Sequence, residues 1–197
     1  VPAVGGPWRL DEVARTVRQR DIPVSAIWTE DWIGWHGSGV TRVLTYAWEW
    51  DQNQYPMLPT RIDQLHQNGF AFLAYFNPFV PKPTEMWNEG KADGYLLHDE
   101  NGDLVSFQDF TGRRVSMVDL SDPNAVDWLQ SYQKRAVTKL GVDGWMADFA
   151  EWYPPTAAPE TDASNWAYHN RYPLEWARTN LESIEAVRSD GASGMER

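Results

Sequence analysis

The sequence contains no cysteine. Disulfide bonds, a thiolate nucleophile and zinc sites with cysteine ligands are therefore excluded. A cysteine-free composition suits a reducing compartment, and no signal-peptide pattern opens the sequence. We therefore expect a cytoplasmic protein.

Positive charge is scarce as well. The chain has 17 Lys and Arg against 28 Asp and Glu, which gives a net charge of −11. No basic patch offers phosphate neutralisation, so nucleic acid is not expected as a partner. No apolar run approaches the roughly 20 residues that cross a bilayer, so no membrane partner is expected either.

Motifs for metal and phosphate chemistry are missing. The four histidines are His36, His66, His98 and His169, and none forms an H-x-x-x-H pair. The sequence has no glycine-rich phosphate loop and no G-x-S-x-G elbow. A metal hydrolase is therefore disfavoured, and we expect no metal site.

Tryptophan, in contrast, is abundant, with 12 residues. Many of them lie beside Asp, Glu and Gly in loop-like places, namely Trp32, Trp35, Trp48, Trp50 and Trp152. The apolar face of a sugar ring stacks on indole while its hydroxyls bond to carboxylates. This composition favours a carbohydrate-binding protein.

The most informative stretch runs from Val142 to Pro154. It begins as a short apolar run and ends on two carboxylates, Asp148 and Glu151, with aromatic rings around them. A buried strand that ends on a carboxylate is typical of an active-site strand in an α/β barrel. The alternative is an ordinary core strand followed by a solvated acidic loop.

Helical and extended patterns alternate along the chain. Apolar spacing predicts helices over 10–20, 60–69, 82–93, 123–140 and 174–184, and strands over 24–28, 42–48, 70–76 and 142–148. Thr60 and Asp63 are predicted to begin the second helix, and Ser121 or Asp122 caps the fourth. A hairpin is predicted around 100–103.

The four predicted strands end on polar residues, and in a (β/α) barrel such residues lie on one rim. These residues are Glu30 with Asp31, Glu49 with Asp51, Asn77, and Asp148 with Glu151. We therefore expect an α/β fold with a parallel sheet. A complete (β/α)8 TIM barrel needs roughly 250 residues. We expect residues 1–197 to be the N-terminal half of one, about four βα units plus a β-hairpin excursion, as a single domain truncated at its C-terminus.

Residues Trp145 to Glu151 resemble the W-M-A-D-F-G-E nucleophile motif of glycoside hydrolase family 31. The resemblance is to the branch that contains the sulfoquinovosidases and related α-glucosidases. Collinear matches extend it over nearly the whole chain, at residues 27–32, 48–50, 55–56, 73–79, 118–120, 169–170, 172–173 and 176–177.

This resemblance implies a (β/α)8 barrel and retaining hydrolysis of α-glycosides. Asp148 is the implied nucleophile, at the end of the fourth barrel strand, and Glu151 is a supporting residue. A second carboxyl group, about 5 Å away in such enzymes, protonates the leaving group and later activates water. The implied partner is a small carbohydrate, without a metal or organic cofactor, and the resemblance leaves the oligomeric state open.

The resemblance also implies a substrate pocket. Asp31 is expected to bond sugar hydroxyls, while Trp28 and Trp145 wall the pocket. The full set of expected substrate-binding residues is Trp28, Glu30, Asp31, Arg42, Tyr46, Trp48, Asn77, Trp145 and Met146.

The chain departs from the family pattern at three points. The acid/base aspartate of the family lies on a later strand, beyond residue 197, so this chain alone is expected to be inactive. Ala150 replaces a glycine of the motif. Glu30 replaces the glutamine of sulfoquinovosidases, the match of Arg42 is shifted by one residue, and Thr45 or Tyr46 lies where those enzymes have tryptophan.

A carboxylate beside a sulfonate is repulsive. The sequence therefore predicts an α-glucosidase-like enzyme acting on a neutral α-linked sugar, with sulfoquinovosidase as the alternative. A non-catalytic sugar-binding relative is a second alternative, motivated by the missing acid/base residue and by Ala150.

Overall fold

The computed structural model of the chain describes residues 1, 3–36, 43–161 and 164–194. The chain forms two compact units, which are described separately. The first unit comprises Val1–Phe76 and Lys134–Met146, and the second comprises Asn77–Gln133 and Ala147–Arg197. The assignment of the chain to a single domain stays a prediction.

The first unit is built on a three-stranded sheet with the order β1-β4-β8. The strands are β1 (Ala26–Trp28), β4 (Ala71–Phe76) and β8 (Gly144–Ala147), and β1 is parallel to β4. The Asp143 amide donates to the Phe72 carbonyl at 3.0 Å, and the Trp145 ring packs on Phe76, so β8 runs in the same direction. The C-terminal ends of the three strands therefore share one edge, as in a (β/α) barrel.

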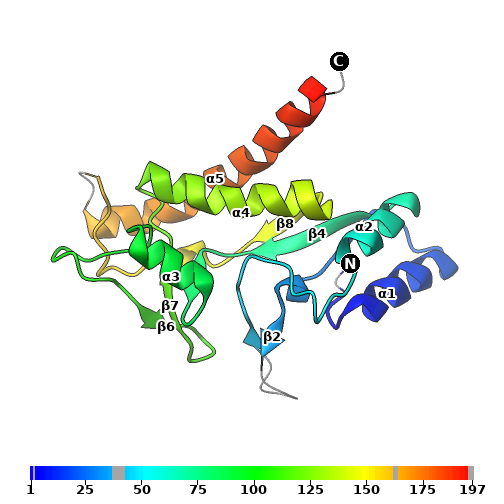
Figure 1. Cartoon of the computed structure of the whole chain (residues 1–197), viewed down its shortest axis with the longest axis horizontal. Helices are drawn as coiled ribbons and strands as arrows, with labels where there is room; N and C mark the ends of the chain where they lie inside the picture. Colours follow the sequence, from blue (N-terminus) through cyan, green and yellow to red (C-terminus); the bar gives the residue numbers. More distant parts are fainter. Residues whose placement is uncertain (2, 37–42, 162–163, 195–197) are drawn as a thin grey trace. The chain divides into compact units, whose positions relative to one another are not determined.

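Two amphipathic helices of this unit lie side by side (Figure 1). They are α1 (Pro7–Gln19) and α2 (Leu58–Gln67); α1 contacts β1, and α2 contacts β4. The predicted start of α2 at Thr60 is wrong. The helix begins after Met57, which is left-handed at φ 61°, and a proline occupies its first turn. Proline there has a preset helical φ and needs no amide partner, so it can begin the helix earlier.

The predicted strand 42–48 is also wrong as a member of the parallel sheet. β3 covers only Val43–Leu44 and pairs antiparallel with β2 (Trp35–His36). Tyr46 and Trp48 have φ values of 52° and 50°. A left-handed backbone cannot continue a strand, so the chain turns there.

The two acids after this turn have local roles. Asp51 Oδ1 accepts from the amides of Asn53 and Gln54, at 2.8 and 3.0 Å. Glu49 Oε1 forms an ion pair with Arg135 Nη1 at 3.7 Å. Neither acid ends a strand of the parallel sheet.

The second unit contains an antiparallel sheet with the order β5-β7-β6. Its strands are β5 (Phe79–Pro81), β7 (Arg114–Met117) and β6 (Phe107–Gln108). The helix α3 (Glu85–Ala92) begins at Thr84, whose hydroxyl accepts from the Trp87 amide, and contacts β5. The predicted turn at 100–103 is confirmed, since an antiparallel bridge joins His98 to Leu104.

Three further helical segments follow along the chain, and the first of them contributes residues to both units. The helix α4 (Pro123–Leu140) follows Asp122, whose Oδ1 accepts from the Asn124 amide, and it ends before Gly141 at φ 82°. Of the two predicted caps, Asp122 is the one observed. The 3₁₀ helix η3 (Ala150–Trp152) precedes α5 (Asn165–Gly194). The helix α5 starts earlier than predicted and contains Pro173 in its interior. None of the helices that the described ranges contain is long and apolar enough to cross a membrane.

Candidate active site

The end of β1 presents one exposed acid and one buried acid. Glu30 is partly exposed and precedes the 3₁₀ helix η1 (Asp31–Ile33), whereas Asp31 is completely buried. Trp28, the last residue of β1, is partly exposed, and its buried indole N–H has no hydrogen-bond partner among the residues described. Of these two neighbouring acids, Glu30 is therefore the one with surface accessible to solvent.

Asp31 is surrounded by donors of its own unit. Its Oδ2 accepts from the Gly5 amide and from Gln54 Nε2, both at 2.9 Å, and its Oδ1 accepts from the hydroxyls of Thr29 and Tyr55. A carboxylate has about four acceptor positions, so these four donors fill them. In this conformation, the four donors leave Asp31 no acceptor position for a sugar hydroxyl. The expected contact of Asp31 with sugar hydroxyls stays a prediction.

Tyr55 extends the same network. Its hydroxyl also accepts from the Gly6 amide at 3.0 Å. Burial, followed by the charge of Asp31, raises the pKa of Tyr55 well above its usual value. The network therefore ties the segment before α1 to the end of β1 and to the segment before α2.

The end of β8 contributes two side chains to the first unit. Trp145 is partly exposed and packs edge-on against Phe76, with ring centroids 5.2 Å apart. Phe76 in turn contacts Trp32, whose indole N–H donates to the Tyr75 carbonyl at 3.1 Å. Met146 is 46% exposed. Trp145 is therefore held by a packed aromatic row, and Met146 faces outward.

The remaining predicted residues of the first unit differ in accessibility. Tyr46 and Trp48 are each 2% exposed, and Tyr46 stacks on Tyr75. Both are core side chains of this unit, and their expected contact with substrate stays a prediction. Arg42 lies outside the described residues.

In the second unit, Asp148 comes directly after β8 and is partly exposed. Phe149 then adopts a left-handed conformation, φ 60° and ψ 18°, and begins η3. Glu151 is exposed on η3. Ala150 lies within the 3₁₀ helix, outside the positive-φ positions of the chain, so it needs no glycine conformation. The replacement of glycine by Ala150 is therefore compatible with this turn.

Asn77 begins the second unit and is 1% exposed. Its Oδ1 accepts from the Phe79 amide at 3.0 Å, which closes a tight turn between β4 and β5. The sequence predicts Asn77 as a rim residue. In the structure, its side-chain oxygen stabilises this local turn.

Five aromatic rings form a cluster that includes Phe149, the residue after Asp148 in the chain. The cluster consists of Phe79, Phe107, Phe110, Phe149 and Trp152. Phe149, the residue after Asp148, stacks on Phe79 at 5.5 Å and contacts Phe110 at 5.4 Å. Sequence reasoning missed this cluster, because its members come from three separate segments.

A group of tyrosines holds the segment after η3. The ring of Tyr153 packs on Tyr168 and Tyr172 of α5, with centroids 5.3 and 4.9 Å apart. His169 Nδ1 lies 2.6 Å from the Tyr153 carbonyl, and the Tyr172 hydroxyl donates to the Val118 carbonyl. The loop that follows Asp148 and Glu151 is therefore anchored to α5 and to the end of β7.

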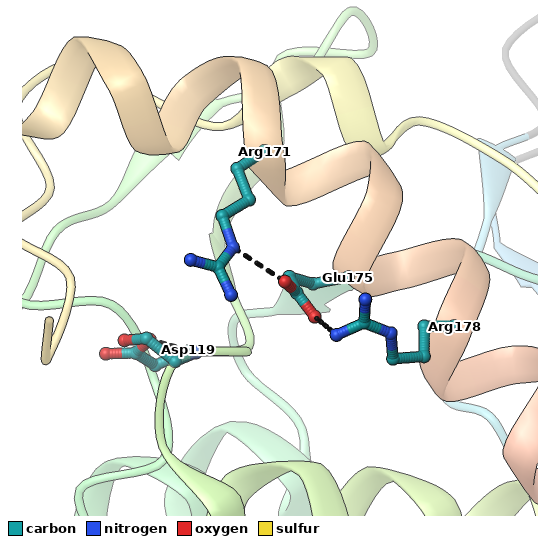
Figure 2. Close-up of polar contacts among 5 residues, drawn as sticks. Asp119, Arg171, Glu175 and Arg178 are labelled. Atoms are coloured by element: carbon teal, nitrogen blue, oxygen red, sulfur yellow. Dashed lines mark hydrogen bonds and ion pairs between the residues drawn. The ribbon is translucent and has the colours of Figure 1, made fainter. Parts of the chain in front are cut away.

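Asp119 is a buried acid beside these tyrosines, at 4% exposure. Its Oδ1 accepts from the amide and hydroxyl of Ser121. Figure 2 shows that Arg171 and Arg178 of α5 both bind Glu175. Burial raises the pKa of Asp119 above its usual 3.8, and the nearby charge of Glu160 adds to the rise.

The raised pKa of Asp119 predicts a pH-dependent effect of Asp119→Asn. The folded state binds this proton more tightly than the unfolded state, so stability falls as pH rises from 3.8 through the raised value. The amide of the variant cannot ionise, and its oxygen can still accept from Ser121. We expect the variant to gain most over the wild type at pH 7 and to lose this advantage as the pH falls towards 4. Thermal unfolding of both proteins across this range is the measurement, and a pH-independent difference would contradict the assignment.

The described residues contain no group of three His, Asp or Glu side chains that could hold a metal ion. Within the first unit, Trp28, Glu30, Trp145 and Met146 lie at the strand ends of one sheet. Within the second, Asp148, Glu151 and the aromatic cluster lie around η3. Each unit by itself offers carboxylates and aromatic rings, which are the groups that bind and cleave sugars.

Known proteins match this chain over most of its length. The model of the glycosyl hydrolase family 31 TIM-barrel domain matches residues 8–194. A sulfoquinovosidase of Escherichia coli is 36% identical over 183 residues, and an α-xylosidase of Lactiplantibacillus pentosus is 33% identical over 138 residues. These matches cover 92% and 70% of the chain but 26% and 18% of the relatives.

The fold is shared with solved structures. A family 31 sulfoquinovosidase from E. rectale, bound to an aza-sugar inhibitor, superposes with a TM-score of 0.84 and 32% identity over 94% of this chain. The match covers 28% of that structure, which agrees with a partial barrel. The family and fold implied by the sequence motifs are thus confirmed, and the chain belongs to the TIM-barrel domain of glycoside hydrolase family 31.

Proposed function

We propose that the complete protein containing this chain is a retaining α-glycoside hydrolase with Asp148 as its nucleophile. The observation that carries this proposal is the position of Asp148, directly after a strand whose C-terminal end lies at the shared edge of a parallel sheet. That edge is where barrel enzymes place their catalytic groups.

In the proposed reaction, the Asp148 carboxylate attacks the anomeric carbon and the bond to the leaving oxygen breaks. An acid/base carboxyl from beyond residue 197 protonates the leaving group and later takes a proton from water, which releases the sugar with its configuration retained. Glu151, one turn along on η3, supports Asp148, either by positioning it or by binding a hydroxyl of the sugar. The 197 residues alone are then inactive.

We propose a neutral α-linked sugar, such as glucose, as the group cleaved. Glu30 supports this choice, because it is the partly exposed acid at the end of β1. A carboxylate can accept hydrogen bonds from sugar hydroxyls, but it repels a sulfonate in a poorly hydrated pocket.

A second candidate is hydrolysis of α-sulfoquinovosides. It is favoured by the two sulfoquinovosidase relatives, which are 36% and 30% identical over 92% and 89% of the chain. Arg42 would then be the sulfonate ligand. In that case Arg42→Ala abolishes activity on an α-sulfoquinovoside and spares an α-glucoside.

Glu30→Gln tests the choice between these sugars. We expect the wild-type complete protein to prefer p-nitrophenyl α-glucoside over p-nitrophenyl α-sulfoquinovoside. Removing the charge should shift the ratio of kcat/KM values towards the sulfoquinovoside by roughly tenfold, since about 1.4 kcal/mol of repulsion is relieved.

Asp127→Asn is the matched control for loss of one negative charge, since Asp127 is exposed on α4. A wild-type preference for the sulfoquinovoside would support the second candidate. It would also show that Glu30 does not repel the sulfonate.

A further inference from the structure

We infer that Phe110 is the stacking platform for the leaving group of the substrate, a residue that determines aglycone specificity. This inference rests on the proposed function, because it places the leaving group beside the nucleophile Asp148. The chemical class it predicts is a glycoside whose aglycone has a flat or apolar face, such as an aryl group or a second sugar ring.

The first argument is the continuity of the aromatic cluster from Asp148 outward. Phe149 follows Asp148 in the chain, and its ring is fixed by stacking on buried Phe79. Phe110 also contacts the ring of Phe149, with centroids 5.4 Å apart and an interplanar angle of 33°. Phe110 also meets Trp152 at 6.3 Å. One row of rings therefore leads from the residue after the nucleophile to Phe110.

The second argument is exposure. Phe79 is fully buried and Phe107, Phe149 and Trp152 are partly buried, whereas Phe110 is 59% exposed. The inner rings support the cluster, and Phe110 is the member with an accessible face. An accessible aromatic face of this kind can stack on a flat or apolar ligand.

The third argument is rigidity. Phe110 is at the tip of the loop between β6 and β7, and buried Asp109 organises this loop. Asp109 Oδ1 accepts from the amides of Thr111 and Arg113, at 2.8 and 3.0 Å, and from the Thr111 hydroxyl at 2.6 Å. Gly112 supplies the left-handed φ of 81° that the turn requires. The backbone that carries Phe110 is thus held in place, which lowers the entropy lost when a ligand stacks on the ring.

The experiment compares two substrates of the complete protein that carry the same sugar. One is a p-nitrophenyl α-glycoside, which has an aromatic leaving group. The other is the α-glycosyl fluoride, whose leaving group has no face to stack. The variant is Phe110→Ala, which removes an exposed ring and leaves the buried members of the cluster in place.

We expect Phe110→Ala to lower kcat/KM on the aryl glycoside by roughly three- to tenfold, mainly through KM, and to leave the fluoride unchanged. Phe110→Trp should restore the aryl activity. Trp8→Ala is the control for loss of an exposed ring, because Trp8 is 65% exposed on α1.

Equal losses on both substrates would overturn the inference, since Phe110 would then act only by supporting Phe149. No loss on either substrate would also overturn it, and would leave the exposed ring for a protein partner. A wild-type protein that cleaves neither substrate would instead contradict the proposed function itself, and the inference would fall with it.

Discussion

Asp148→Asn in the complete protein is expected to reduce the hydrolysis of its α-glycoside substrate by at least roughly a thousandfold. The amide cannot attack the anomeric carbon, and removal of the nucleophile from a covalent mechanism costs on the order of 10³-fold or more in kcat. KM for the substrate should change little, because the side chain keeps its shape. Steady-state kinetics on the preferred p-nitrophenyl α-glycoside give both values.

Matched variants separate chemistry from folding. Asp127→Asn, the same change at an exposed position of α4, should keep wild-type activity. Glu151→Gln should cause a smaller loss than Asp148→Asn, because Glu151 is exposed on η3 and is proposed only to support the nucleophile.

External azide provides a second check of the mechanism. In Asp148→Gly, azide can enter the vacated space, attack the anomeric carbon and displace an aryl leaving group. It should therefore restore product formation and yield the β-glycosyl azide. Full activity of Asp148→Asn, or the α-azide as product, would rule out Asp148 as the nucleophile of a retaining enzyme.

Asp31→Asn is expected to lower the free energy of unfolding by about 3 kcal/mol, the largest stability effect that we predict. One oxygen becomes an NH₂ group among four donors, from Gly5, Thr29, Gln54 and Tyr55. Each buried donor left without an acceptor costs about 1–3 kcal/mol. Urea unfolding of the complete protein, followed by tryptophan fluorescence, measures the change.

Gln54→Ala is the matched control, because it removes one partly buried donor and leaves the carboxylate intact. We expect it to cost about 1 kcal/mol or less. If Asp31→Asn kept the stability of the wild type but lost activity, Asp31 would be the sugar ligand that the family resemblance implies. A loss of stability larger than that of Gln54→Ala would instead identify Asp31 as a structural residue.

Local patterns predicted most of the regular structure. The apolar spacing of Leu10, Val13 and Val17 defines the buried face of α1, and Gly141 ends α4 at a left-handed φ. These signals involve residues within about one or two helical turns of each other, so they act before any long-range contact forms. The α/β class and the strand ending before Asp148 followed from the same kind of signal.

The errors arose where the path of the chain overrides local preference. Residues 42–48 have strand composition, yet β3 pairs antiparallel with β2, and the left-handed Tyr46 and Trp48 follow the strand and turn the chain. The start of α2 depended on Met57 in a left-handed conformation, which is rare for a residue with a side chain of this size. Neither turn carries the glycine or asparagine that usually marks such a conformation in a sequence.

The family, the α/β architecture and the choice of Asp148 as candidate nucleophile all follow from the amino-acid sequence, because motif and strand end coincide within seven residues. Which of the neighbouring acids Glu30 and Asp31 is exposed depends on tertiary packing, and so does the contact of Phe110 with Phe149. Burial and ring contacts depend on segments far apart in the chain, and no local pattern encodes where those segments meet.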